Sequence, residues 1–183
     1  MIKFGLKKKI RPVNRLDRNT SGLVIFAKCE YIQECLSKQM LNKSFKKEYI
    51  AIVSGKFANA EKSGTINLPI ARKENSIIER CINKDGQKAI THYEVIKQYN
   101  KYSLVKCSLE TGRTHQIRVH MAYIGHPVLN DPLYGTKKQT TPFGQYLHAK
   151  TLGFKHPRTG EYMEFDSELP QEFVEKIEEL KNL

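Results

Sequence analysis

Residues 15–22 have the sequence Arg-Leu-Asp-Arg-Asn-Thr-Ser-Gly and place one carboxylate between two guanidinium groups, just before an apolar segment. In an extended chain, side chains two positions apart lie on the same face, so Arg15 and Asp17 are expected to point together and Arg18 to point away. Nearby opposite charges favour an ionised carboxylate, so we expect Asp17 to be an anion that is able to act as a nucleophile. The alternative interpretation is a surface ion pair beside a turn.

The residues around this stretch predict a mixture of strands and helices. Thr20–Gly22 is typical of a turn before a buried strand over 22–28, and the spacing of apolar residues predicts a helix over 30–43. Further strands are expected at about 47–54, 88–97, 102–110, 146–155 and 161–166, with a strand and a hairpin within 65–83 and a helix over 170–181. The segment 114–124 fits a strand by its alternation, or a helix that Thr114 caps and Gly125 ends. We therefore predict one α+β domain over residues 1–183, with a mixed, largely antiparallel β-sheet and flanking helices.

The charge of the chain favours a polyanionic partner. Lys and Arg number 31 against 19 Asp and Glu, which gives a formal charge of +12 and a pI near 9.5. The basic residues concentrate in two runs, the first made of Lys3, Lys7, Lys8, Lys9, Arg11, Arg15 and Arg18, and the second of Lys43, Lys46 and Lys47. Groups of this kind neutralise phosphates and bind nucleic acid without regard to sequence. The alternative for each run is a solvated charged face.

Several other classes of protein are disfavoured. The chain has no apolar stretch of the roughly 18–20 residues that a membrane span needs and no secretory pattern. Its four cysteines, at positions 29, 35, 81 and 107, form no Cys-x-x-Cys pair, which is typical of reduced thiols in a cytoplasmic protein. His115, His120 and His126 lack the spacing of a metal site, and no phosphate-binding glycine loop or dinucleotide motif occurs. We expect no metal and no cofactor.

Four stretches, in this order, resemble the motifs of the RluA-type pseudouridine synthases. Residues 15–22 resemble the run with the catalytic aspartate, 47–55 the tyrosine-bearing strand, 111–120 the arginine motif with its following loop at 125–135, and 147–157 the closing strand and hairpin. The agreement in order and spacing extends over residues 13–170. Asn14 stands where the family usually has histidine. Family members also carry a strand with a Lys-Pro-x-Gly turn further upstream, so we expect an N-terminally truncated catalytic domain.

The resemblance implies the pseudouridine synthase catalytic fold and an enzyme that isomerises uridine to pseudouridine in ribosomal or transfer RNA, without a cofactor. The reaction breaks the glycosidic bond, rotates the uracil and rejoins it through carbon 5, and the base leaves its stack to react. By resemblance, Asp17 is the catalytic group, Tyr49 stacks on the uracil and takes up a proton, and Arg113 pairs with Asp17. The same resemblance favours a helix over 114–124.

Other residues of the motifs are expected to fix the aspartate loop or to meet the RNA: Arg15, Arg18, Thr20, His115 and Arg118. His126, Asp131 and Tyr134 are equally expected to stabilise turns. Two other functions stay open. One is an RNA-binding module without activity, because the upstream strand of the family is absent from this chain. The other is a glycoside or nucleoside hydrolase that uses Asp17, although a second carboxylate motif is missing.

Overall fold

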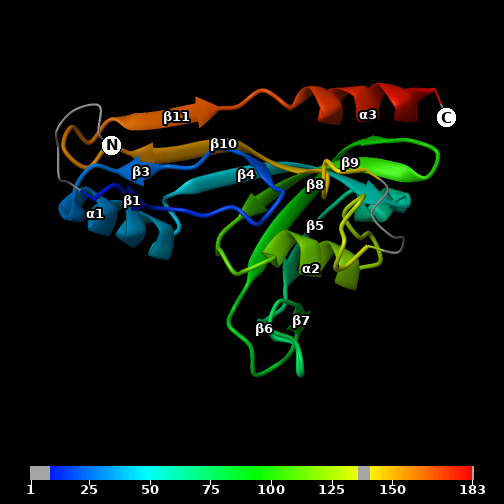
Figure 1. Ribbon diagram of the computed structural model, residues 1–183, viewed down its shortest axis with the longest axis horizontal. Coiled ribbons are helices and arrows are strands. Elements are labelled where there is room, and N and C mark those ends of the chain that lie inside the picture. Colours follow the sequence, from blue (N-terminus) through cyan, green and yellow to red (C-terminus); the bar gives the residue numbers. More distant parts are fainter. Residues whose placement is uncertain (1–8, 136–140, 183) are drawn as a thin grey trace.

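The computed structural model describes residues 9–135 and 141–182, and a seven-stranded sheet lies at its centre (Figure 1). From one edge to the other, its main strands are β11 (Tyr162–Asp166), β10 (Leu147–Lys155), β4 (Lys46–Ser54), β9 (Tyr102–Leu109), β8 (Ile90–Gln98) and β5 (Ser63–Asn67). These neighbours are antiparallel, whereas β2 (Ser21–Gly22) pairs with β10 in parallel. The prediction of a mixed, largely antiparallel sheet is confirmed.

Strand β4 lies in the middle of the sheet, and helices cover both of its faces. Alternate residues of a strand point to opposite faces, and β4 follows this rule. Tyr49, Ala51 and Val53 are buried in one apolar cluster, which α2 (Gln116–Tyr123) completes with Ile117 and Met121. On the opposite face, Ile52 packs with residues of α3 (Gln171–Lys181), Phe173 and Leu180. A third cluster joins α1 (Glu30–Leu41) to β10.

Helix α2 confirms the helical interpretation of 114–124, with a different start. The helix begins after His115, which has a left-handed φ of 59°, and not after Thr114. At the other end, Gly125 has a φ of 86° and donates its N–H to the Ala122 carbonyl at 3.1 Å. The His126 N–H reaches the Met121 carbonyl at 2.9 Å. These two bonds form a Schellman motif, which ends the helix as the glycine predicts.

The segment predicted as one strand over 22–28 is two short strands instead. β2 pairs with β10, and β3 (Phe26–Ala27) pairs with β1 (Arg11–Pro12) in a separate small sheet. The turn also lies earlier than expected, because the Thr20 N–H bonds the Asp17 carbonyl at 3.0 Å. A Cβ on Gly22, whose φ is 110°, would lie 2.3 Å from the Ala149 carbonyl oxygen. Only glycine allows the backbone this close to β10.

The other helices, α1 and α3, and the β8–β9 hairpin lie where the sequence predicts them. Within 65–83, the strand β5 precedes the hairpin of β6 (Ile70–Arg72) and β7 (Arg80–Ile82), as predicted. A short 3-10 helix, η2 (Asn59–Glu61), lies before β5. Figure 1 shows this hairpin projecting from the body of the molecule below α2. Of the helices in the described parts of the chain, none has the length and apolar character to cross a membrane.

Candidate active site

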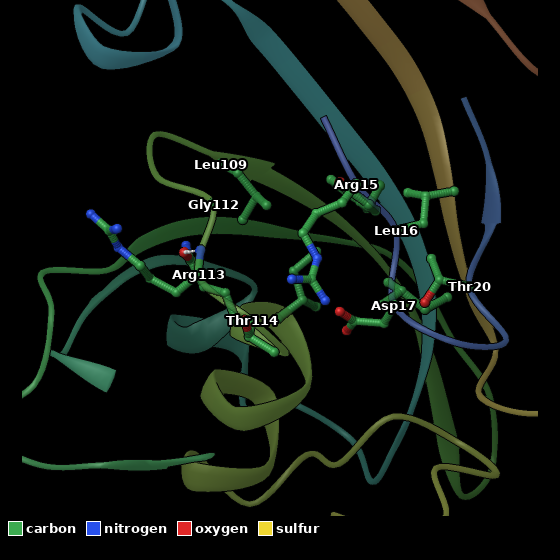
Figure 2. A pocket seen from close by; sticks show the side chains of 12 residues that line it. Arg15, Leu16, Asp17, Thr20, Leu109, Gly112, Arg113 and Thr114 are labelled. Carbon is green, nitrogen blue, oxygen red and sulfur yellow. Dashed lines mark hydrogen bonds between the residues drawn. The ribbon is translucent and has the colours of Figure 1, made fainter. Parts of the chain in front are cut away.

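A pocket of about 60 Å³ brings together residues from all four motifs (Figure 2). Arg15, Asp17 and Thr20 come from the loop between β1 and β2, Tyr49 from β4, and Arg113 from the loop before α2. The remaining lining residues are Leu16, Leu109, Gly112, Thr114, Gln116, Ile117 and Leu147. Of the eight residues singled out from the sequence, these five line the pocket, whereas Arg18, His115 and Arg118 do not.

The loop that carries Asp17 is held from behind by residues far along the chain. Gln145 is 1% exposed, and its amide donates to the Arg18 carbonyl at 2.7 Å and to the Thr20 hydroxyl at 2.9 Å. Asn14 closes the other side, because its amide donates to the Leu23 carbonyl and its oxygen accepts the Ile25 N–H. The Arg18 side chain is exposed. Gln145 is a positioning residue that the sequence motifs did not single out.

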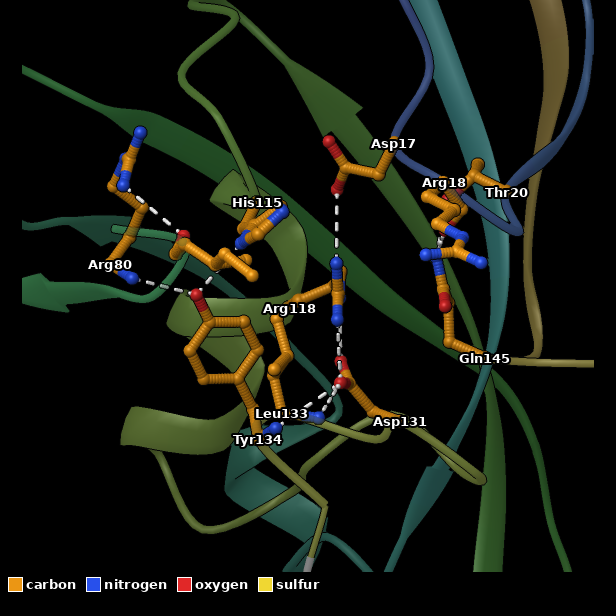
Figure 3. A network of polar contacts seen from close by, with 11 residues as sticks. Asp17, Arg18, Thr20, Arg80, His115, Arg118, Asp131, Leu133, Tyr134 and Gln145 are labelled. Carbon is orange, nitrogen blue, oxygen red and sulfur yellow. Dashed lines mark hydrogen bonds and ion pairs between the residues drawn. The ribbon is translucent and has the colours of Figure 1, made fainter. Parts of the chain in front are cut away.

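The ion-pair partner of Asp17 is Arg118. The Nη1 atom of Arg118 lies 3.6 Å from the Asp17 carboxylate, and the same guanidinium binds Asp131 through two hydrogen bonds of 2.7 Å (Figure 3). Asp131 also accepts the N–H groups of Leu133 and Tyr134. The side chains of Arg118 and Asp131 are 3% and 0% exposed. The guanidinium is therefore fixed in place between the two carboxylates.

Arg118 stays charged in this buried position. Burial alone lowers the pKa of a guanidinium, but the hydrogen bonds and charge of Asp131, with the charge of Asp17, outweigh burial and raise the pKa of Arg118. The ring of Tyr134 also lies against the guanidinium, with 5.1 Å between the central carbon and the ring centroid. The pocket thus keeps a permanent cation beside the carboxylate of Asp17.

The expected pairing of Arg113 with Asp17 is not what the structure shows. The Arg113 guanidinium donates to the Lys88 carbonyl at 3.0 Å and to the Gln87 side chain at 2.9 Å, and Figure 2 shows it pointing away from Asp17. The cause is the backbone of the loop, because the Arg113 N–H is tied to the side chain of Gln116 at 2.9 Å. The sequence prediction chose the wrong arginine of the motif. Arg15 is exposed, and its side chain points toward Asp17 in the same view.

Tyr49 faces the pocket as a neutral phenol. Its residue is 8% exposed, and burial, with the nearby charge of Asp17, raises the pKa of Tyr49 to about 12. The hydroxyl therefore keeps its proton at neutral pH and can donate a hydrogen bond. Tyr49 and Asp17 line the same pocket.

His115 points away from the pocket, toward Tyr134. Its Nδ1 lies 2.8 Å from the Tyr134 hydroxyl, which also accepts the Arg80 N–H at 2.8 Å (Figure 3). Burial lowers the pKa of His115, and the charge of Arg118 acts in the same direction against that of Asp17. A neutral His115 therefore supports the tyrosine that packs on Arg118.

The two basic runs have different surroundings. In the second run, Lys43 pairs with Glu110, Lys46 lies 3.1 Å from Glu164, and Lys47 is 7% exposed. This run is therefore not the open basic face that the sequence suggested. In the first run, Lys3, Lys7 and Lys8 lie outside the described residues, Arg11 pairs with Glu30, and Lys9, Arg15 and Arg18 are exposed. In residues 9–135 and 141–182, no group of three or more metal-ligating side chains is assembled.

Comparison of the chain with known proteins identifies its family. The family model for RNA pseudouridylate synthase matches residues 2–123. The chain is 45% identical over 179 residues to the uncharacterized RNA pseudouridine synthase YlyB of Bacillus subtilis, covering 97% of this chain and 58% of that protein. It is 41% identical over 170 residues to the ribosomal large subunit pseudouridine synthase D of Zymomonas mobilis, covering 87% and 53%. The chain thus spans under two thirds of the length of these relatives.

A solved structure shares the fold as well. The human RNA pseudouridylate synthase domain containing 1 superposes with a TM-score of 0.76 and 27% sequence identity, covering 88% of this chain and 70% of that one. The family model covers two thirds of the chain, and its span contains Asp17, Tyr49 and Arg118. The α+β architecture predicted from the sequence is therefore that of a known group, and the chain belongs to the RNA pseudouridylate synthase family.

Proposed function

We propose that the protein isomerises uridine to pseudouridine in RNA and that Asp17 is its catalytic carboxylate. The observation that carries the proposal is the pocket in which Asp17 and Tyr49 meet, with the buried cation of Arg118 beside the carboxylate. Arg118 lies 3.6 Å from the Asp17 carboxylate and holds it in place, as an aimed nucleophile requires. Asp17 attacks the ribose or the uracil ring. The glycosidic bond between C1′ and N1 then breaks, and carbon 5 of the rotated uracil bonds to C1′ while the bond to Asp17 is released. Carbon 5 loses its proton, and N1 takes up a proton.

The other site residues support this reaction in distinct ways. Tyr49 stacks on the flipped uracil, and its protonated phenol donates a hydrogen bond or a proton within the pocket. Thr20 and His115 position the loop and the Arg118 network through the contacts described above. Arg15 and Arg18 are exposed beside the pocket and bind phosphates of the RNA backbone. No cofactor takes part in the proposed reaction.

The first RNA to test is the large-subunit ribosomal RNA, because relatives at about 40% identity are named for the ribosomal large subunit. Transfer RNA is the second. Either substrate would place the protein in the cytoplasm. The domain over residues 1–183 is proposed to carry the site residues named here, and the Asp17–Arg118 pair forms within it.

Tritium release from RNA labelled at carbon 5 of uridine tests this function, because the isomerisation replaces that hydrogen. The wild-type chain is expected to release tritium, and Asp17→Asn to release none while keeping its circular dichroism spectrum. Release by Asp17→Asn contradicts the catalytic role of this carboxylate. Free uracil among the products indicates a hydrolase, and RNA binding without release indicates an inactive binding module.

A pair of arginine variants separates the two candidates for the partner of Asp17. Arg118→Met is expected to lower kcat by about 10²–10³-fold, as the loss of one preorganised charged group does. Arg113→Met, the matched control, keeps kcat within about ten-fold and raises KM, since its guanidinium lies outside the pair. The opposite order of the two kcat values restores Arg113 as the partner.

A further inference from the structure

Lys47 is a buried cation whose described partners are neutral. It precedes Tyr49 by two residues on β4, so both side chains lie on the same face of the sheet. The residue is 7% exposed, and its ammonium donates to the Thr111 carbonyl at 3.3 Å. Among the described residues, no carboxylate lies within ion-pair distance of Lys47. The neighbouring Lys46 is different, because it pairs with Glu164 and Glu48.

An ammonium in such a place is destabilising unless something else binds it. Burial lowers the pKa of Lys47 to about 8, and the positive charge of Arg113 acts in the same direction. An ammonium has three N–H donors, and one carbonyl satisfies only one of them. Buried charges in proteins are normally paired, so a cation without a carboxylate is better explained by an anion that arrives with a ligand.

The ammonium lies directly behind the wall of the pocket. Gly112 lines the pocket and is exposed, and a Cβ at this position would lie 3.7 Å from the Nζ atom of Lys47. Glycine therefore leaves the ammonium without a side chain over it. Arg113, the next residue, is also exposed and donates only to the neutral oxygens of Lys88 and Gln87 in the described structure. Two cations without acidic partners thus flank one glycine at the pocket.

The two carboxylates of the site already pair with Arg118. Asp17 pairs with Arg118, and Asp131 accepts two hydrogen bonds from the same guanidinium. Neither carboxylate forms an ion pair with Lys47 or Arg113, which donate to neutral oxygens instead. The rim at residues 111–113 consequently presents positive charge to whatever enters the pocket.

We propose that Lys47 and Arg113 together bind a backbone phosphate next to the uridine that enters the pocket, and that Gly112 gives the phosphate access to Lys47. A phosphate offers several acceptor oxygens to these donors, and charge-assisted bonds of this type are short and strong. The inference rests on the proposed function, because an RNA substrate brings the phosphate to the pocket. Lys47 is then a substrate-binding residue that fixes the register of the RNA while Asp17 reacts.

Neutral phosphates test this contact without altering the protein. The probe is an RNA hairpin from the large-subunit ribosomal RNA with one loop uridine, in which the phosphate on either side of that uridine is replaced by methylphosphonate. For one of the two positions, the wild-type Kd is expected to rise about 10- to 100-fold, the range for a lost hydrogen bond between charged groups. Lys47→Met is expected to bind the natural hairpin equally weakly and to lose no further affinity upon methylphosphonate substitution.

Lys46→Met is the matched control, since it removes the same charge from the neighbouring residue on the opposite face of β4. It should keep the full sensitivity to methylphosphonate. Lys47→Met should also lower the slope of log affinity against log salt by about 0.7, the value for one phosphate contact on a single strand. Circular dichroism checks the fold of both variants, and removal of an unpaired buried charge is expected to leave it intact.

Three outcomes overturn the inference. In the first, the wild type binds the natural and both substituted hairpins with equal Kd. In the second, methylphosphonate raises the Kd of Lys47→Met as much as that of the wild type. In the third, Lys46→Met weakens binding of the natural hairpin and abolishes the methylphosphonate effect as much as Lys47→Met does. A tritium-release measurement on the natural hairpin with the wild type tests the proposed function separately. Release together with any of the three outcomes refutes only the phosphate contact. A Kd pattern as expected without release refutes only the isomerase activity.

Discussion

Asp131→Asn is the substitution that most directly tests the buried network behind Asp17. The asparagine has the same shape as the aspartate, but it removes the charge that faces Arg118. Arg118 would then remain 3% exposed, with Asp17 at 3.6 Å as its carboxylate partner. Loss of one partner of a buried, doubly hydrogen-bonded ion pair is expected to lower the free energy of unfolding by about 3–5 kcal/mol.

The expected size of this effect follows from the two bonds of 2.7 Å and from the burial of both groups. For a chain of this length, each kcal/mol shifts the Tm by about 2–4 °C, so we expect Asp131→Asn to lower it by about 6–20 °C. The exposed pair of Lys176 and Glu179 on α3 is the control. Lys176→Met should change the free energy of unfolding by no more than about 1 kcal/mol.

Urea unfolding of Asp131→Asn, Arg118→Met and the double variant measures the coupling between the two side chains. The double variant should be more stable than the sum of the single losses predicts, by at least about 1 kcal/mol, because removal of both groups leaves neither the buried guanidinium nor the buried Asp131 carboxylate without its partner. Additive losses would refute the reasoning, as would a loss in Asp131→Asn no larger than that in Lys176→Met.

Two further predictions concern pH and the β2–β10 pairing. Burial lowers the pKa of His120 and His148, so the unfolded chain binds more protons than the folded chain at acidic pH. The free energy of unfolding should therefore fall as the pH drops below about 6.5. Urea midpoints that stay equal between about pH 8 and about pH 5 contradict this prediction. Gly22→Ala should cost about 2–4 kcal/mol, because its Cβ meets the Ala149 carbonyl. Gly125→Ala, with open space around it, should cost about 1–2 kcal/mol in the same urea assay, and equal losses would argue against the close contact.

The strands were predictable because their signal is local. A strand was predicted at about 47–54, and β4 spans Lys46–Ser54. The short strands β2 and β3 were not predictable, because the apolar run 23–27 looks like one strand. Its division depends on where β10 passes, more than a hundred residues later in the chain.

Five of the eight residues predicted for the site line the pocket, but the side-chain contacts among them were not predictable from the sequence. Motif resemblance found Asp17, Tyr49 and the arginine motif, but the choice between Arg113 and Arg118 depends on how the loop before α2 turns. That turn is set by the left-handed His115 and by Gln116, whose amide bonds the Ile90 carbonyl at 2.9 Å. Lys46 was misjudged for a similar reason, because one of its two acidic partners, Glu164, lies 118 residues away. Spacing along the chain carries no information about such contacts.

The hold of Gln145 and β10 on the Asp17 loop has a consequence for how the protein is made. Gln145 lies 127 residues after Arg18, and β10 follows it, so these supports are synthesised well after the loop that they hold. Until then, β2 has no strand to pair with and the turn at Asp17 lacks its backing. A nascent chain that ends before β10 should therefore lack the proposed isomerase activity, and this activity should appear when β10 pairs with β2.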